Sequence, residues 1–158
     1  MNARKRNRLK HYDYSQNGVY FITICAKGHK QLFGAIDVGA ACGCPQLSNI
    51  GKLIEAEISR LSQIYSGIYV DCYTIMPNHL HMVIVIGRES RRPQAAPTIS
   101  HIINQFKGVV SKRAGFSIWQ KSFHDHIIRN EADYIRIAEY IENNPLKWTK
   151  DRYYTKEE

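Results

Sequence analysis

Hydrophobic and polar residues repeat along this chain with two periods, and the periods distinguish strands from helices. Residues 18–25, 68–75 and 80–86 are short runs rich in β-branched and aromatic side chains, which is typical of strands. Residues 117–129 form a longer run of the same kind. Apolar residues at helical spacing predict three helices, which begin after Ser48 or Asn49, after Thr98 and after Asn130. The last of them is expected to end near Asn143, because Pro145 stops it.

A turn through residues 27–30 is expected to lead from the first strand into a short strand over residues 31–36, forming a hairpin. The resulting element order is that of a ferredoxin-like α+β sandwich. We therefore predict a ferredoxin-like antiparallel sheet with helices on one face, an extra hairpin strand and an extra C-terminal helix. The other face of the sheet is expected to be free to meet a ligand.

The whole chain, residues 1–158, is predicted to form a single domain without internal repeats. Residues 1–14 are a basic arm with no apolar pattern. Residues 88–97 contain three arginines and two prolines, and we expect an exposed loop there. No linker is long enough to separate a second domain.

Charge and composition narrow the location and the partners of the protein. The chain has 22 Lys and Arg against 14 acidic residues, a net charge of +8, which favours polyanionic partners without identifying one. No apolar run approaches the roughly 20 residues needed to cross a bilayer, and the N-terminus lacks the apolar part of a signal peptide. The four cysteines, Cys25, Cys42, Cys44 and Cys72, lack paired zinc-site spacing. A cytoplasmic protein without membrane contact is therefore expected.

Two histidines lie two residues apart on an otherwise apolar strand. Because side chains alternate along a strand, His79 and His81 share one face with Val83 and Val85. Burying a polar ring without a partner costs about 1–3 kcal/mol, so each ring needs a partner. Either histidine alone is best interpreted as a hydrogen-bonded core residue, whereas the pair at this spacing favours a metal site.

Tyr140 and Asn144 lie one turn apart on the last predicted helix. A phenol and a carboxamide on one helical face can present a nucleophile and an oxygen ligand to the same point. The alternative interpretation is ordinary, since Tyr140 can be a packing residue and Asn144 a helix C-cap followed by Pro145. The helix alone does not decide between them.

Three segments together identify a family. The sequence Pro-Asn-His-Leu-His at residues 77–81 is followed by Trp-Gln-Lys-Ser-Phe at 119–123 and by Tyr-Ile-Glu-Asn-Asn-Pro at 140–145. This combination resembles the REP-associated tyrosine transposases, which are single-tyrosine HUH nucleases (histidine, bulky hydrophobe, histidine) related to insertion-sequence transposases. The resemblance extends over nearly the whole chain, and it includes residues 20–25 and 102–107.

The resemblance implies a role for four residues of these motifs. His79 and His81 would be metal ligands, Asn144 the third protein ligand and Tyr140 the nucleophile, carried on the C-terminal helix. Insertion-sequence relatives commonly have Gln at the Asn144 position, and the shorter amide fits the REP-associated branch. The metal would be Mg²⁺ or Mn²⁺, and mixed nitrogen and oxygen ligands suit Mn²⁺ better.

The implied activity is metal-dependent cleavage and rejoining of single-stranded or hairpin DNA, as a transposase. Tyr140 would attack a phosphodiester and leave a 5′-phosphotyrosine and a free 3′-OH. The DNA partner would be a palindromic hairpin. Two alternatives remain open, a sequence-specific DNA-binding protein with an inactive nuclease site and a metal-dependent phosphoesterase with a water nucleophile. A monomer is favoured because the link at residues 129–130 is short, although a homodimer that exchanges its tyrosine helix is possible.

Basic residues in two places are candidates for contacts with DNA phosphates. Such contacts position a strand without reading its sequence. One group is the N-terminal arm and the other lies at the end of the second helix: Arg4, Lys5, Arg6, Arg8 and Lys10, then Lys107, Lys112 and Arg113. Tyr12, Tyr14 and Trp119 are candidates for stacking on unpaired bases. For each of these residues, a solvated tail or a core position is an equally good interpretation.

Overall fold

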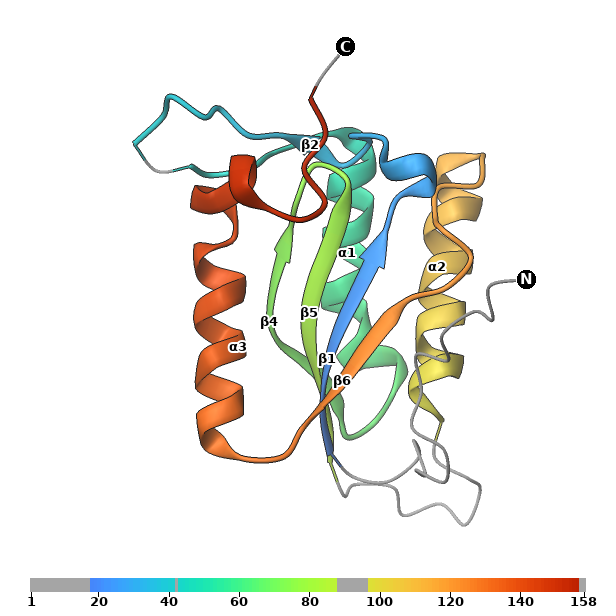
Figure 1. Cartoon of the computed structure of the whole chain (residues 1–158). Coiled ribbons are helices and arrows are strands. Elements are labelled where there is room, and N and C mark those ends of the chain that lie inside the picture. The colour runs from blue at the N-terminus through green and yellow to red at the C-terminus, as the bar shows by residue number, and fades with distance from the viewer. Residues whose placement is uncertain (1–17, 42, 88–96, 157–158) are drawn as a thin grey trace, which may run out of the picture.

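A computed structural model describes residues 18–41, 43–87 and 97–156 (Figure 1). The basic arm, and the predicted exposed loop apart from Pro97, lie outside the described residues. None of the helices within the described ranges is both long and apolar enough to cross a membrane.

Four antiparallel strands form the main sheet, and they are β1 (Gly18–Cys25), β4 (Ile68–Ile75), β5 (His79–Ile86) and β6 (His124–Ile128). Their order across the sheet is β4-β5-β1-β6, so β1 pairs with β5 on one edge and β6 on the other. With helices after the first and third of these strands, this is the split βαβ arrangement. The predicted antiparallel α+β fold is confirmed.

The three helices lie on opposite faces of this sheet. Helices α1 (Asn49–Ile64) and α2 (Ile99–Ala114) pack on one face, where they form the main core with the inward residues of β1 and β5. Helix α3 (Glu131–Asn143) packs on the opposite face through a smaller cluster of Val83, Ile137 and Ile141 (Figure 1). The expectation that this second face would be free was therefore wrong, because the apolar stripe of α3 covers part of it.

Each helix begins where the sequence predicts. The side chains of Ser48, Thr98 and Asn130 accept a hydrogen bond from the backbone N–H three residues on, at 3.1, 3.2 and 2.8 Å. These bonds satisfy donors that the first turn of a helix leaves without a partner. After α3 the chain continues as a 3-10 helix, η2 (Pro145–Lys150).

The predicted hairpin between residues 18–25 and 31–36 is wrong. Both edges of β1 are occupied by β5 and β6, so the following segment cannot pair with it. After a short 3-10 turn, η1 (Lys27–His29), the chain forms β2 (Gly34–Ala35), which pairs with β3 (Gln46–Leu47) in a separate sheet. Gly34 allows the close approach, since a Cβ there would lie 2.3 Å from the carbonyl oxygen of Gln46.

The long strand predicted over residues 117–129 is shorter in the structure, where only His124–Ile128 belongs to the sheet. Before it, Trp119 turns into the main core and is 6% exposed. Its ring centroid lies 5.1 Å from that of Phe33, and its Nε1 donates to the carbonyl of Lys107 at 3.1 Å. Trp119 is therefore a core residue and does not offer its ring to bases.

Candidate metal and nucleophile site

The two histidines of β5 point to the sheet face that α3 covers, as the alternation predicted. His79 is fully buried and His81 is 2% exposed, and their ring centroids are 4.6 Å apart. Across the ladder their partners on β1 are Cys25 and Thr23. Both imidazoles are thus held by the sheet backbone at the end of β5 next to the β4–β5 turn.

The hydrogen bonds around His79 fix its tautomer. Asn78 donates through Nδ2 to the carbonyls of His29 and Tyr153, at 3.1 and 2.7 Å, so its Oδ1 is left as an acceptor. That oxygen lies 2.8 Å from Nδ1 of His79, which must carry the hydrogen. The Nε2 atom of neutral His79 therefore has a free lone pair, and within the described ranges it makes no hydrogen bond. Such a ring presents a metal-ligating nitrogen.

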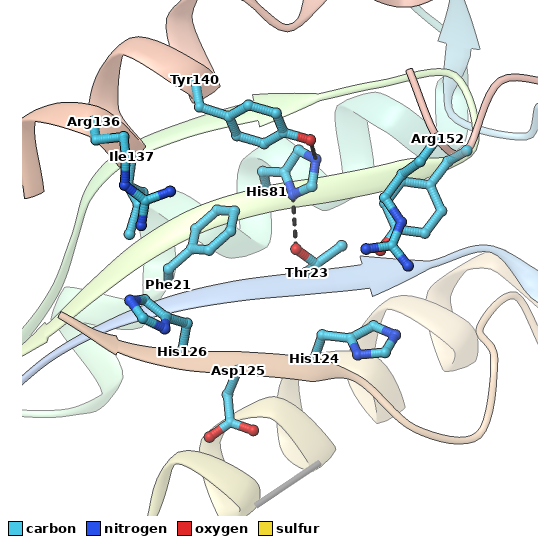
Figure 2. Close-up of a pocket in the computed structure, with 11 residues that line it drawn as sticks. Phe21, Thr23, His81, His124, Asp125, His126, Arg136, Ile137, Tyr140 and Arg152 are labelled. Carbon is cyan, nitrogen blue, oxygen red and sulfur yellow. Dashed lines mark hydrogen bonds between the residues drawn. The ribbon is translucent and has the colours of Figure 1, made fainter. Parts of the chain in front are cut away.

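His81 is held in a similar way by a hydroxyl group. Thr23 Oγ1 lies 2.8 Å from Nδ1 of His81 and can accept its hydrogen. The second nitrogen, Nε2, lies 3.4 Å from the hydroxyl oxygen of Tyr140 (Figure 2). The imidazole thus presents Nε2 toward the tyrosine.

Asp151, after η2, joins the histidines. One oxygen of its carboxylate lies 3.9 Å from Nε2 of His79, and the side chain is only 1% exposed. Ligand atoms of His79, His81 and Asp151 all lie within 4.8 Å of one another. This cluster could hold a metal ion.

Asn144 lies beside the cluster, and its amide orientation follows from its partner. Nδ2 of Asn144 donates to Asp151 at 2.8 Å, which leaves Oδ1 on the other side. Asn144 is 3% exposed, and its Oδ1 has no hydrogen-bond partner among the described residues. Buried polar atoms are nearly always paired in proteins. The orphaned oxygen of Asn144 and the orphaned nitrogen of His79 fit the donor set of a divalent ion.

Burial keeps both imidazoles uncharged. It lowers the pKa of His79 to about 4, against the opposing effect of the Asp151 carboxylate. Burial also lowers the pKa of His81 well below its usual 6.5, and the neighbouring His79 and Arg152 add to this effect. At neutral pH both rings therefore offer lone pairs, and no proton has to leave before a metal binds.

Tyr140 is more accessible than the histidines and is 41% exposed. Burial and the Asp151 carboxylate raise the pKa of its hydroxyl, while hydrogen bonding with Asn144 and the charge of Arg152 oppose the rise. The phenol is therefore protonated at neutral pH. It faces a pocket of about 460 Å³ between α3 and the sheet, which Phe21, His81 and Arg152 also line (Figure 2). A substrate can reach the hydroxyl from this pocket.

Comparison with known proteins identifies the family. No family model matches the chain. A Haemophilus influenzae protein named only as uncharacterized is 36% identical over 96% of this chain and 93% of its own length. The REP-associated tyrosine transposase of Escherichia coli is 29% identical over 51% of this chain and 47% of its own length. The solved structure of a REP-associated tyrosine transposase bound to a REP hairpin superposes with a TM-score of 0.65, at 20% identity, over 89% of this chain and 73% of that one.

This chain belongs to the REP-associated tyrosine transposase family.

Asp151 is the member of this site that the amino-acid sequence did not reveal. It follows Asn144 by seven residues, beyond Pro145 and in a segment without helical or strand periodicity. The only available signal was an acidic residue shortly after the Asn-Pro pair. The predicted residues His79, His81, Tyr140 and Asn144 do come together in the structure.

The basic residues proposed for DNA contact are not gathered at this site. Lys107 and Arg113 lie on α2, across the sheet from Tyr140, and both are engaged within the protein. Nζ of Lys107 donates to the carbonyl of Gln120 at 2.6 Å, and Arg113 pairs with the buried carboxylate of Glu57 at 2.8 Å. Lys112, on the same helix, is exposed. The arm residues Arg4, Lys5, Arg6, Arg8 and Lys10 lie outside the described residues.

Proposed function

We propose that this transposase-family chain cleaves and rejoins single-stranded or hairpin DNA through a covalent 5′-phosphotyrosine on Tyr140. The observation that carries the proposal is the hydroxyl of Tyr140 within 3.4 Å of His81, beside a buried cluster with two orphaned ligand atoms. An alcohol nucleophile next to a cation site is the arrangement that phosphoryl transfer requires.

The metal ligands in this proposal are His79, His81 and Asn144, with Asp151 as a further oxygen ligand. Two neutral imidazoles and amide and carboxylate oxygens suit Mn²⁺, and Mg²⁺ is the alternative. When bound, a divalent ion held by these residues would neutralise charge on the scissile phosphate and polarise one of its nonbridging oxygens.

The chemistry at Tyr140 is a transesterification. The phenolic oxygen attacks phosphorus, an O–P bond to tyrosine forms, and the bond from phosphorus to the 3′ oxygen breaks. The phenol loses its proton and the departing 3′ oxygen gains one, so the net proton count does not change. Because a phosphodiester replaces a phosphodiester, the free 3′-OH can reverse the reaction without ATP.

The proposed form is a monomer that acts in cis. Tyr140 and His81 of one chain lie within 3.4 Å, and only Arg129 and Asn130 separate β6 from α3. The proposed substrate is a palindromic hairpin with a single-stranded flank, in keeping with the related transposase whose structure contains a REP hairpin.

A covalent adduct on a denaturing gel tests this function. The full chain is incubated with a 3′-labelled hairpin oligonucleotide that carries a single-stranded flank, and with Mg²⁺ or Mn²⁺. We expect a labelled protein band for the wild type and none for Tyr140→Phe. Tyr134→Phe is the matched control on the same helix, since the Tyr134 hydroxyl bonds to Asp71 away from the cluster. It should retain the adduct.

Each other outcome identifies an alternative. Cleavage without an adduct would indicate a phosphoesterase that uses water, and binding without cleavage would indicate a DNA-binding protein with an inactive site.

The role of the basic arm in DNA binding stays a prediction, and it has its own measurement. Deleting the residues before Leu9 removes four charges and should flatten the salt dependence of affinity by up to about 0.7 per contacted phosphate.

A further inference from the structure

Tyr140 borders two cavities, and a basic segment lines the second of them. The pocket described above lies between α3 and the sheet. A cavity of about 280 Å³ lies at the end of α3 and along η2, where Lys147 and Lys150 line it. Tyr140 and Arg152 line both cavities. A chain-like ligand that occupies the pocket can therefore continue past Tyr140 into the second cavity.

The residues from Asn144 to Arg152 have two sides with different roles. On the inner side, Asn144 and Asp151 bond to each other beside His79, and Trp148 is 4% exposed. On the outer side, Lys147 and Lys150 are exposed, and both line the second cavity. The buried side anchors the segment, so the outer cations are held at a fixed place beside Tyr140.

These outer cations are available for an external anion. Among the described residues, Lys147, Lys150 and Arg152 make no ion pair with a carboxylate, whereas Arg60 and Arg113 both pair with Glu57. Arg152 lies over the ring of Tyr153, with its guanidinium carbon 5.0 Å from the ring centroid. Three cations and one carboxylate, that of Asp151, line this cavity. The excess of positive charge attracts a polyanion, and sequence-independent affinity for nucleic acid comes from such phosphate contacts.

We propose that Lys147, Lys150 and Arg152 form a phosphate cradle that holds the DNA strand on one side of the scissile bond. The proposal rests on the function proposed above, and it assigns the backbone contacts to the segment after α3 instead of to α2. The occupant is the single-stranded flank of the substrate, whose phosphates pass from the cradle to Tyr140. Because the contacts are to phosphates, they are expected to be independent of base sequence.

The test compares two variants that lose the same charge. Lys147→Gln/Lys150→Gln removes two charges from the cradle, and Lys52→Gln/Lys121→Gln removes two exposed charges that line neither cavity. Binding to the flanked hairpin is measured over a salt series, with Tyr140→Phe added to each protein so that the DNA stays intact. We expect the slope of log affinity against log salt to flatten by up to about 1.4 for the cradle variant, at about 0.7 per phosphate contact. The control slope should stay unchanged.

Truncated oligonucleotides locate the strand. Removing the nucleotides of the flank on one side of the scissile phosphate should abolish the difference between the cradle variant and the control, and removing those on the other side should preserve it. Equal slopes for the two variants on the full substrate would overturn the cradle. Adduct formation by the wild type is measured separately. Equal slopes together with an adduct would reject the cradle alone, and a slope difference without an adduct would reject the tyrosine chemistry alone. Circular dichroism of both variants checks that the fold is retained.

Discussion

Both faces of the main sheet contain fully buried side chains, yet they differ in how the atoms of those side chains are satisfied. On the α1–α2 face, Ile22, Leu80 and Met82 are fully buried and pack in a hydrophobic cluster. The buried carboxylate of Glu57 on α1 is paired with Arg60 and Arg113. On the α3 face, His79 and His81 are just as buried, but the cluster beside them contains nitrogen and oxygen atoms that lack a protein partner. Burial alone therefore does not separate core from site. The convergence of the orphaned atoms of His79 and Asn144 beside the Asp151 carboxylate does, because each such atom costs stability unless a ligand satisfies it.

The largest expected effect comes from removing a ligand on the α3 face. His81→Ala should lower Mn²⁺ affinity and DNA cleavage by more than about 100-fold, since even the partners that orient metal ligands are worth 10–100-fold. Calorimetric titration with Mn²⁺ and the adduct gel measure the two losses. Unchanged Mn²⁺ affinity would return His81 to the role of a hydrogen-bonded core residue.

A substitution on the opposite face of the same strand is expected to lower stability and to leave metal affinity unchanged. Leu80→Ala, between the two histidines in sequence, should lower the free energy of unfolding by about 2–5 kcal/mol, because it leaves a cavity in the main core. Urea unfolding measures this loss. Below the unfolding transition, Mn²⁺ affinity should match that of the wild type, and a joint loss of stability and affinity would show that the two faces are not independent.

The free energy of unfolding should depend on pH because the histidines are buried. The pKa of His79 falls from 6.5 to about 4 on folding, so between these values the unfolded state binds more protons than the folded state. The free energy of unfolding without metal should therefore fall as pH drops from about 6.5 toward 4. A shift of this size corresponds to about 3 kcal/mol. Urea unfolding at pH 7 and pH 5 measures the part of this change that falls between those pH values, about 2 kcal/mol. His79→Gln should weaken the dependence, and an identical dependence in that variant would contradict the assignment.

The smallest effect on Mn²⁺ affinity is expected for Asp151, which joins the cluster from the segment after η2. Asp151→Asn keeps the shape of the side chain and removes its charge, so Mn²⁺ affinity should fall about 10-fold or somewhat more if the carboxylate is a ligand or orients one. Calorimetric titration measures the change. A gain in affinity would instead mean that the hydrogen bond from Nδ2 of Asn144 to Asp151, at 2.8 Å, holds Oδ1 of Asn144 away from the metal.

The sequence predicted those features that depend on local chemistry. The N-caps of all three long helices follow from Ser48, Thr98 and Asn130, because a cap needs only residues within one turn. The facing of His79 and His81 follows from strand alternation. The family resemblance supplied Tyr140 and Asn144, for which the helix alone allowed ordinary roles.

The features that the sequence did not predict depend on contacts between distant segments. The hairpin expected after β1 fails because β5 and β6 occupy both of its edges, and no local pattern announces that competition. Asp151 reaches His79 across 72 positions of the chain through the course of η2, which carries no periodic signal. The position of α3 on the second face likewise depends on how Ile137 and Ile141 meet Val83.

The attachment of α3 to the sheet has a mechanical consequence for the proposed intermediate. Once DNA is linked to Tyr140, any tension on the strand is carried by α3, whose buried anchors on β5 are the contacts of Ile137 and Ile141 with Val83. The phosphotyrosine bond is covalent and far stronger than this apolar contact. Under tension, these apolar contacts of α3 would therefore give way before the covalent bond to DNA. The side chains that make them take no part in the chemistry.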